Sequence, residues 1–328
     1  MTRRRLSWWL ATLALLGACG GEDRNPVPFD PDTSPRWRLI PAGDFLMGMG
    51  SVDGLSLANP QHPVRLTRPF WMSTVPVMEE EWETLMAQPI HHLYGAAPCA
   101  TCPANWVTWL DAAWYANTLS KREGLPTCYD FSACSFFREN SPFFDLRTIV
   151  VCDEAVPASQ DCLGYRLPTE AEWEYVATSG GLQMGEPGCD DDDETCWVYY
   201  QMLSEEASLE GFDRHDFAHS HTYPVGSVYP PTPWGIWGMN RNVKQFVHGT
   251  AAPYPQDTTT RVVDPIYDSP EGYGGVRGWA FNELGADPYE RMMMRINTRG
   301  DQVGFRLVRT ATVEEAARAN TVDLREAP

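Results

Sequence analysis

The chain has 328 residues, of which 44 are Asp or Glu and 25 are Lys or Arg, so its formal net charge is -19 at pH 7. A field of that sign opposes nucleic acid, and we exclude nucleic-acid binding on this ground. Thirteen Trp, thirteen Tyr and thirteen Phe supply apolar mass for a substantial core, which excludes a chain that is disordered throughout.

The first residues are typical of an export signal. Arg3–Arg5 form a basic segment, Leu6–Leu16 is mostly apolar, and Leu16-Gly17-Ala18-Cys19 resembles a bacterial lipobox. This layout predicts a lipoprotein signal peptide over residues 1–18, with Cys19 acylated in the mature protein. Ordinary secretion, with Cys19 removed or left free, is the alternative.

Three segments are expected after the signal. Residues 19–36 comprise the acylated cysteine and a flexible tether rich in proline, and residues 37–309 form one folded domain. Residues 310–328 are a polar tail, either a frayed helix or disordered. Because Gly20 carries no acidic retention signal, we expect an exported, membrane-anchored lipoprotein in the outer membrane or at the cell surface.

Helix and strand signals alternate along the domain. Helices are predicted over residues 79–88, stopped by Pro89, and over 108–123 and 169–178, which both open with capping-box patterns. Short strand-like runs lie at residues 37–40, 64–66, 225–228 and 304–308. With 27 Pro and 26 Gly, this pattern predicts an α+β domain of low regular secondary structure, braced by disulfides or metal ions.

Eight cysteines follow Cys19, and an even number in an exported chain predicts a disulfide framework. They are Cys99, Cys102, Cys128, Cys134, Cys152, Cys162, Cys189 and Cys196. The four from Cys128 to Cys162 bracket a β-hairpin. They can pair nested, Cys128 with Cys162 and Cys134 with Cys152, or as neighbours, and the sequence does not decide between these patterns.

Cys99 and Cys102 form the closest pair. Pro98 and Pro103 bracket them in a loop, whereas a redox pair needs a helix start, so we favour a structural bridge over a redox site. A zinc site with the nearby His91 and His92 ranks third.

Two other clusters could bind metal. Cys189 and Cys196 enclose the acidic run 190–194, which lacks the glycine turn of an EF-hand, so we favour a solvated loop clipped by a disulfide over a calcium site. A loose histidine cluster with neighbouring acids is interpreted as solvated loop residues rather than a metal site; it comprises His215, His219, His221, Asp213 and Asp216.

Several segments, in order, resemble the formylglycine-generating enzyme, or sulfatase-modifying factor, family. The most specific is Gly164–Tyr175, which reads GYRLPTEAEWEY. The others are residues 40–48, 69–77, 107–120, 224–227, 234–239 and 304–308. The resemblance spans residues 37–309 and implies a sulfatase-modifying-factor-like domain, related to C-type lectin-like folds and often calcium-stabilised.

The resemblance also implies a copper site, but this chain lacks the cysteines that would bind the ion. Active members oxidise a sulfatase cysteine to formylglycine with O2 and a copper(I) ion on two thiolates near the C-terminus. The chain has no cysteine after Cys196, and an ungapped match puts Glu283 and Pro288 at the two thiol positions. Because soft thiolates select copper(I), we expect no catalytic residues there and no copper.

A second departure affects the family's calcium loop. Asn242 and Val243 persist from that motif, but Arg241 and Lys244 add positive charge and Gln245 replaces a carboxylate. Calcium prefers several oxygen ligands that include carboxylates. The sequence therefore predicts an eroded calcium site, in which Arg241 or Lys244 occupies the place of the ion or the loop has simply drifted.

The favoured function is a noncatalytic binding or structural module, anchored in the envelope and recognising a peptide, protein or glycan. The resemblance places its cleft at Trp279, Phe281, Glu283, Arg295 and Arg299, and ordinary packing is the alternative for these residues. The alternative function is a formylglycine-generating oxidase or another metal-dependent oxidoreductase of the same superfamily.

Overall fold

A computed structural model of the chain describes residues 30, 33–49, 57–90, 97–141, 144–152, 161–180, 221–227, 231–249, 252–267, 272–283 and 288–319. The predicted lipidation site Cys19, the cysteines Cys189 and Cys196, the acidic run between them, and His215 and His219 lie outside these residues.

Short strands form small sheets and one hairpin. The first sheet has the order β1-β4-β12 and is antiparallel throughout, with β1 at Trp37–Ile40, β4 at Phe70–Ser73 and β12 at Val308–Thr310. The second has the order β10-β9-β7-β11, with β10 at Arg291–Arg295, β9 at Tyr273–Arg277, β7 at Lys244–Val247 and β11 at Val303–Phe305. In this sheet only the β7–β11 pair is parallel.

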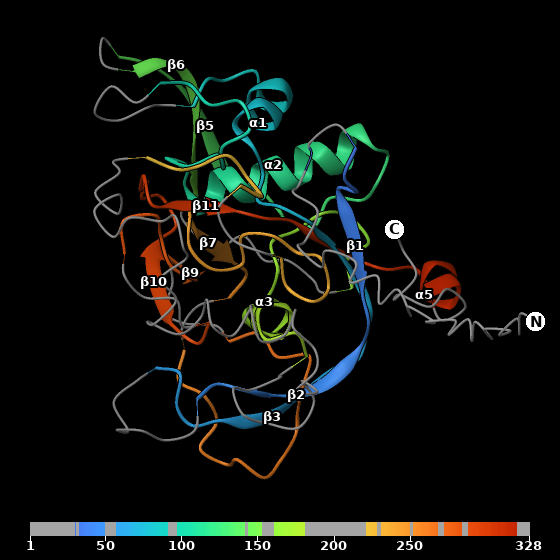
Figure 1. Cartoon of the computed structure of the whole chain (residues 1–328). Helices are drawn as coiled ribbons and strands as arrows, with labels where there is room; N and C mark the ends of the chain where they lie inside the picture. Colours follow the sequence, from blue (N-terminus) through green and yellow to red (C-terminus); the bar gives the residue numbers. More distant parts are fainter. Residues whose placement is uncertain are drawn as a thin grey trace, which may run out of the picture.

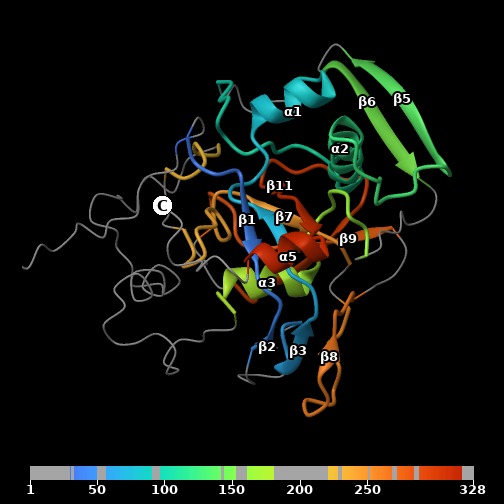
Figure 2. The same cartoon turned by 90° about the vertical axis from the view of Figure 1, so that its right-hand side faces the viewer.

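The third sheet has the order β2-β3-β8, with β2 at Gly43–Met47, β3 at His62–Leu66 and β8 at Val262–Val263. Strands β5 (Cys134–Ser141) and β6 (Phe144–Cys152) form the predicted hairpin. Helices α1 (Glu79–Met86) and α2 (Trp109–Arg122) lie with this hairpin at one end of the molecule, and β2 and β3 lie at the other (Figure 1). Helix α3 (Glu170–Ala177) lies between them, and a quarter turn shows the hairpin projecting past α2 (Figure 2).

The helix starts follow the predicted caps. Thr108 Oγ1 accepts a hydrogen bond from Asp111 N at 2.9 Å, and Asp111 Oδ2 accepts one from Thr108 N at 2.9 Å, so α2 begins with a complete capping box. Thr169 and Glu172 form the same reciprocal pair at α3. These contacts satisfy backbone N–H groups that a helix start otherwise leaves unbonded.

Two local expectations need correction. Helix α1 ends at Met86 rather than at residue 88, because Ala87 already adopts a left-handed conformation with φ 53°. Residues 225–227 form a turn and not a strand. In the polar tail, β12 continues to Thr310, and Val313–Ala319 forms a short helix, α5, which is one of the two expected outcomes.

Two buried apolar clusters make up the core. One joins α1 and α2 to the β7–β11 region, where the ring of Trp82 stacks on Tyr115 at 5.7 Å and Phe305 meets Tyr115 edge-on at 5.3 Å. The other surrounds the fully buried Trp173 of α3 and contacts β2 and β3. Burying each such ring stabilises the fold by about 2–3 kcal/mol.

Helix α3 buries carboxylates as well as apolar side chains. Glu170, Glu172 and Glu174 are all buried, and each forms an ion pair with at least one arginine. Arg291 Nη2 donates to Glu170 at 2.5 Å, Arg166 makes two 2.7 Å bonds to Glu172, and Arg277 Nη2 donates to Glu174 at 2.5 Å. These charges cancel inside the core, where an unpaired charge would be costly.

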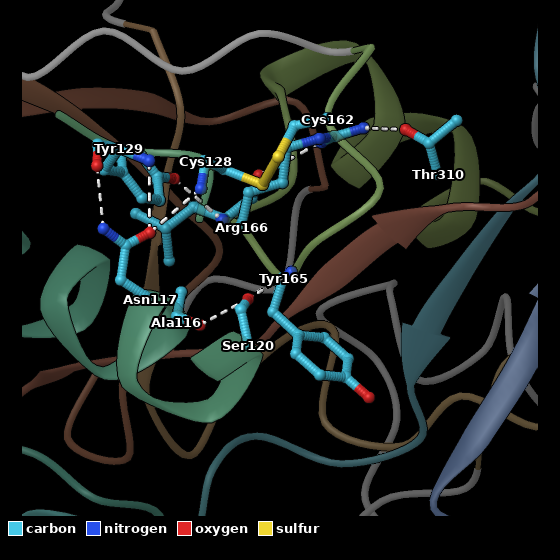
Figure 3. The surroundings of a disulfide bond; sticks show 10 residues. Ala116, Asn117, Ser120, Cys128, Tyr129, Cys162, Tyr165, Arg166 and Thr310 are labelled. Atoms are coloured by element: carbon cyan, nitrogen blue, oxygen red, sulfur yellow. Dashed lines mark hydrogen bonds between the residues drawn. A yellow bond between two sulfur atoms is a disulfide. The ribbon is translucent and has the colours of Figure 1, made fainter. Parts of the chain in front are cut away.

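The four central cysteines pair in the nested pattern. Cys128 bonds to Cys162, and Cys134 bonds to Cys152 across the two ends of the hairpin. Beside the first bridge, Asn117 of α2 accepts hydrogen bonds from Cys128 N at 3.0 Å and Tyr129 N at 3.1 Å (Figure 3). The bridge and this amide together fasten the segment after α2 to the helix. No helix of the described residues is long and apolar enough to cross a membrane.

Candidate functional site

The loop after β9 carries the first predicted copper position. Gly278 begins it with φ 81°, and an added Cβ would lie 3.0 Å from the oxygen of Met239, so only glycine fits there. Phe281 N then donates to Asn242 O at 3.0 Å. This bond holds the loop 278–283 against the predicted calcium segment, so the two departures from the family pattern are neighbours in space.

Glu283 and Lys244 connect these two segments directly. Lys244 Nζ forms an ion pair with Glu283 Oε1, and Glu283 Oε2 accepts a hydrogen bond from Ala280 N at 2.9 Å. The side chains of Lys244 and Glu283 are 12% and 25% exposed, so water screens the pair only partly. Both oxygens of the carboxylate therefore have partners within the protein.

The side chain of Asn242 is also bonded within the protein. Its Oδ1 accepts from Tyr223 N and its Nδ2 donates to Tyr223 O, both at 2.9 Å. Arg241 and Asn242 adopt left-handed conformations with φ 64° and 66°, and Val243 is fully buried. The side-chain amide of Asn242 thus forms the two hydrogen bonds to Tyr223 that a backbone amide would form in a strand pair. Its oxygen is therefore already bonded within the protein.

Gln245 is fully buried behind this loop. Its Oε1 accepts from Trp173 Nε1 at 3.0 Å and from Arg306 Nε at 2.5 Å, and its Nε2 donates to Gly238 O at 2.6 Å. Arg306 Nη2 also donates to Gly238 O, at 2.8 Å. The guanidinium of Arg306 therefore supplies a positive charge beside the oxygens of Gln245 and Gly238.

Pro288, the second predicted copper position, has no side-chain donor. Its carbonyl oxygen accepts from Arg277 Nη2 at 3.0 Å, the same nitrogen that donates to Glu174. The chain at Pro288 is thus attached to the charged network of α3. Neither Glu283 nor Pro288 offers the soft ligand that copper(I) requires, so the residues at these two positions do not fit that ion.

The five residues of the predicted cleft do not converge on one point. Trp279, Phe281 and Glu283 share the loop after β9, where Phe281 is buried. Arg295 pairs with Tyr273 at the opposite end of the β9–β10 ladder, about 13 Å from the loop at the strand rise of 3.3 Å per residue. Its guanidinium lies 5.1 Å from the centre of the Tyr273 ring.

Arg299 contributes to the fold rather than to an open surface. Its Nη2 donates to Asp111 Oδ2 at 2.8 Å, and Asp111 is the partner of Thr108 in the capping box of α2. His221, the one member of the histidine cluster that is described, is exposed. Across the described ranges, no group of three His, Cys, Asp or Glu residues could hold a metal ion.

A pocket that the sequence did not indicate lies between β1, α1 and α2. It has a volume of about 350 Å³ and is lined by charged groups and rings that include Arg36, Trp37, Glu80, Glu81, Tyr115, Arg122 and Glu123. Arg36 Nη2 binds both oxygens of Glu81 at 2.5 and 2.6 Å, and Tyr165 OH donates to Glu123 at 2.5 Å. Burial first, and then the nearby charge of Glu81, raise the pKa of Tyr115. This lining suits a small polar group or a side chain of a bound protein.

Comparisons with known proteins agree with this architecture. The family model of the sulfatase-modifying factor enzyme 1-like domain matches residues 24–311. Treponema denticola variable protein 1 superposes with a TM-score of 0.60 at 22% identity, covering 84% of this chain and 95% of that one. PvdO from Pseudomonas aeruginosa superposes with a TM-score of 0.54 at 21% identity, covering 88% of this chain and all of that one.

Among curated proteins, the chaperone protein LppX of Paenibacillus barcinonensis is 28% identical over 183 residues. The match covers 54% of this chain and 61% of LppX, so the chain spans about three fifths of that relative. The fold is that of a sulfatase-modifying-factor domain braced by disulfides. This chain belongs to the sulfatase-modifying factor family.

Proposed function

We propose that this chain is a lipid-anchored envelope protein whose sulfatase-modifying-factor-like domain is a noncatalytic binding module. The observation that carries the proposal is the ion pair of Lys244 with Glu283. An ungapped match to the family puts Glu283 at the first thiol position, and both oxygens of its carboxylate are already bonded. A hard, internally paired oxygen ligand is a poor substitute for a thiolate on copper(I).

The residues of the family's calcium loop also support a domain that binds no metal there. The oxygens that an ion would need are engaged by Tyr223 at Asn242, and by Trp173 and Arg306 at Gln245. The charges of Lys244 and Arg306 lie in this region and repel a divalent cation. We infer that the protein folds without calcium at this loop.

A protein partner is favoured over a small-molecule substrate. LppX, the curated relative, is named a chaperone, and a chaperone acts by contacting another protein. The pocket between β1, α1 and α2 provides a concavity with rings and charges, which is the composition of protein-binding anchors. Two of the expected cleft residues would add contact area for a partner at separate places, Trp279 in the loop after β9 and Arg295 at the far end of β10.

Export is supported by the three disulfides of the described residues, because such bridges persist in oxidising compartments. The lipid anchor at Cys19 and an outer-membrane or cell-surface location belong to the proposal. Fractionation of cells that express the wild-type chain and a Cys19→Ser variant tests the anchor. We expect the wild type in the membrane fraction and the variant in the soluble fraction, and identical membrane association would overturn it.

The alternative function is an oxidase that uses copper or another metal. Metal analysis of the purified chain, followed by O2 consumption with a cysteine peptide, separates it from a binding module. We expect substoichiometric copper and iron and no O2 uptake above the buffer rate. Stoichiometric metal with peptide-dependent O2 uptake would replace the binding module with the oxidase.

A further inference from the structure

The bridge between Cys99 and Cys102 differs in its surroundings from the other two disulfides of the described residues. It encloses only two residues, so it restricts the unfolded chain least and contributes least as a structural staple. The turn lies against the start of α1, where Glu79 N donates to Cys102 O at 2.9 Å and Glu80 N donates to Ala100 O at 3.1 Å. The cysteine pair is thus held against the start of α1, about 20 residues earlier in the sequence. The flanking prolines indicated a loop and gave no sign of this helix start.

The two cysteines differ in the exposure of the whole residue. Cys102 is 2% exposed, whereas Cys99 is half-buried between the exposed Pro98 and Ala100. An incoming group therefore meets Cys99 more readily than Cys102. This asymmetry suits a two-step thiol exchange, since one sulfur must meet the partner and the other must leave when the bridge opens.

The surroundings of Cys102 suit its reduced form. The carbonyl oxygen of Thr222 lies 3.6 Å from Cys102 Sγ, at a distance where a thiol can donate its proton. The sulfur of a disulfide has no proton to give. This acceptor therefore stabilises the reduced pair relative to the oxidised one, and it favours a neutral thiol at Cys102 with the reactive thiolate at Cys99.

A buried carboxylate completes the arrangement. Glu79 is 4% exposed, and its Oε2 accepts a hydrogen bond from Cys99 N at 3.0 Å. Burial, opposed by the hydrogen bond from Cys99 N and assisted by the nearby charge of Glu83, raises the pKa of Glu79 to about 7. Its charge therefore changes near neutral pH, directly beside the reachable cysteine. Within the described residues, neither Cys134 nor Cys152 has a hydrogen bond to a carboxylate.

We propose that Cys99 and Cys102 form a redox-active disulfide that exchanges two electrons with a dithiol of an exported protein, with Glu79 as a positioning residue. A thiolate of the partner attacks Sγ of Cys99, the S–S bond breaks, and its electron pair goes to Sγ of Cys102, which takes a proton. The second partner thiolate then attacks its own mixed disulfide and releases Cys99. The partner dithiol is oxidised to a disulfide, and the pair in this chain is reduced to two thiols. This exchange requires no copper and is distinct from formylglycine synthesis.

The first test is native-state reduction of the full chain by graded dithiothreitol, with alkylation and peptide mapping. We expect Cys99–Cys102 to open at a dithiol concentration at least tenfold lower than Cys134–Cys152, which is half-buried and serves as the matched control. If the two bridges open together, or Cys99–Cys102 opens last, the proposal is wrong.

The second test compares Cys102→Ser with Cys99→Ser, each checked for folding by near-ultraviolet circular dichroism. We expect the Cys99 thiol of the first variant to form a mixed disulfide with glutathione disulfide at least tenfold faster than the Cys102 thiol of the second. Equal rates would contradict the assigned roles.

The third test measures the rate of Cys99–Cys102 reduction against pH in the wild type and in Glu79→Gln. We expect an inflection near pH 7 in the wild type and none in the variant. A merely structural glutamate would leave the shape of the profile unchanged, and that result would remove Glu79 from the proposal.

Discussion

Lys244 and Glu283, which are 39 residues apart in sequence, form an ion pair between β7 and the loop after β9. On the family resemblance, Lys244 falls in the segment of the calcium loop and Glu283 falls at the first thiol position. We propose that this pair of opposite charges stands where the family's two metal sites would have ligands. A charge left alone at either position would be only partly hydrated, so each charge stabilises the other.

A double-mutant cycle on Lys244→Met and Glu283→Gln measures this pair. We expect a coupling free energy of about 1–2 kcal/mol in urea unfolding, because the side chains are only partly exposed. The control is the pair Arg65 with Asp44, whose side chains are 45% and 46% exposed and for which we expect a smaller coupling. Equal coupling in the two pairs would contradict this account of Lys244.

The buried charges of α3 predict a large effect from one substitution. Arg277→Met leaves Glu174 without its principal partner in a fully buried position, and we expect a loss of about 3–5 kcal/mol in the free energy of unfolding. Adding Glu174→Gln to that variant should recover part of the loss, because it removes the unpaired charge. A double variant that is less stable than Arg277→Met would contradict the pairing.

His248 predicts a loss of stability in acid. Burial and, secondarily, the charge of Arg166 lower the pKa of His248 from 6.5 to about 4, so the native state holds the neutral ring. The unfolded chain takes up a proton as the pH falls below 6.5, and stability is lost progressively from there to about pH 4. Between pH 7 and pH 5, we expect the free energy of unfolding in urea to fall by about 2 kcal/mol less in His248→Gln than in the wild type. Parallel pH curves for the two proteins would contradict a buried neutral histidine.

The nested disulfides predict an order of stabilities. Cys128–Cys162 has a sequence separation of 34 and Cys134–Cys152 one of 18. On chain entropy alone, replacing both cysteines of the longer bridge by serine should cost about 4 kcal/mol, and replacing those of the shorter about 3 kcal/mol. The melting temperatures of the two double variants check this order. A larger fall in melting temperature on loss of the hairpin bridge Cys134–Cys152 would contradict it.

The elements with local signals could be predicted from the sequence. Thr108 with Asp111, and Thr169 with Glu172, lie three residues apart, and the structure forms both capping boxes. The end of α1 could not be placed, because Ala87 turns left-handed without a glycine. The family motifs established the fold class, since the match is carried by residue identity across the whole domain.

Contacts between remote segments account for what the sequence could not show. In the sequence, Glu170 and Glu174 resemble the solvated acids of a surface helix, and only the sheet register brings Arg291 and Arg277 against them. The same register separates Arg295 from the loop after β9, so the expected cleft residues do not meet. Glu79 lies 20 residues before Cys99, and nothing local to either residue indicates their hydrogen bond.

The most direct test of the central claim is a copper(I) competition titration of the full chain against a chromogenic chelator, under ascorbate so that disulfides stay closed. The double variant Cys99→Ser/Cys102→Ser is the control for copper held by that pair. We expect the chelator to retain all of the copper with both proteins, because Glu283 and Pro288 provide no thiolate. One tightly held equivalent of copper that persists in the control variant would contradict the claim and restore the oxidase.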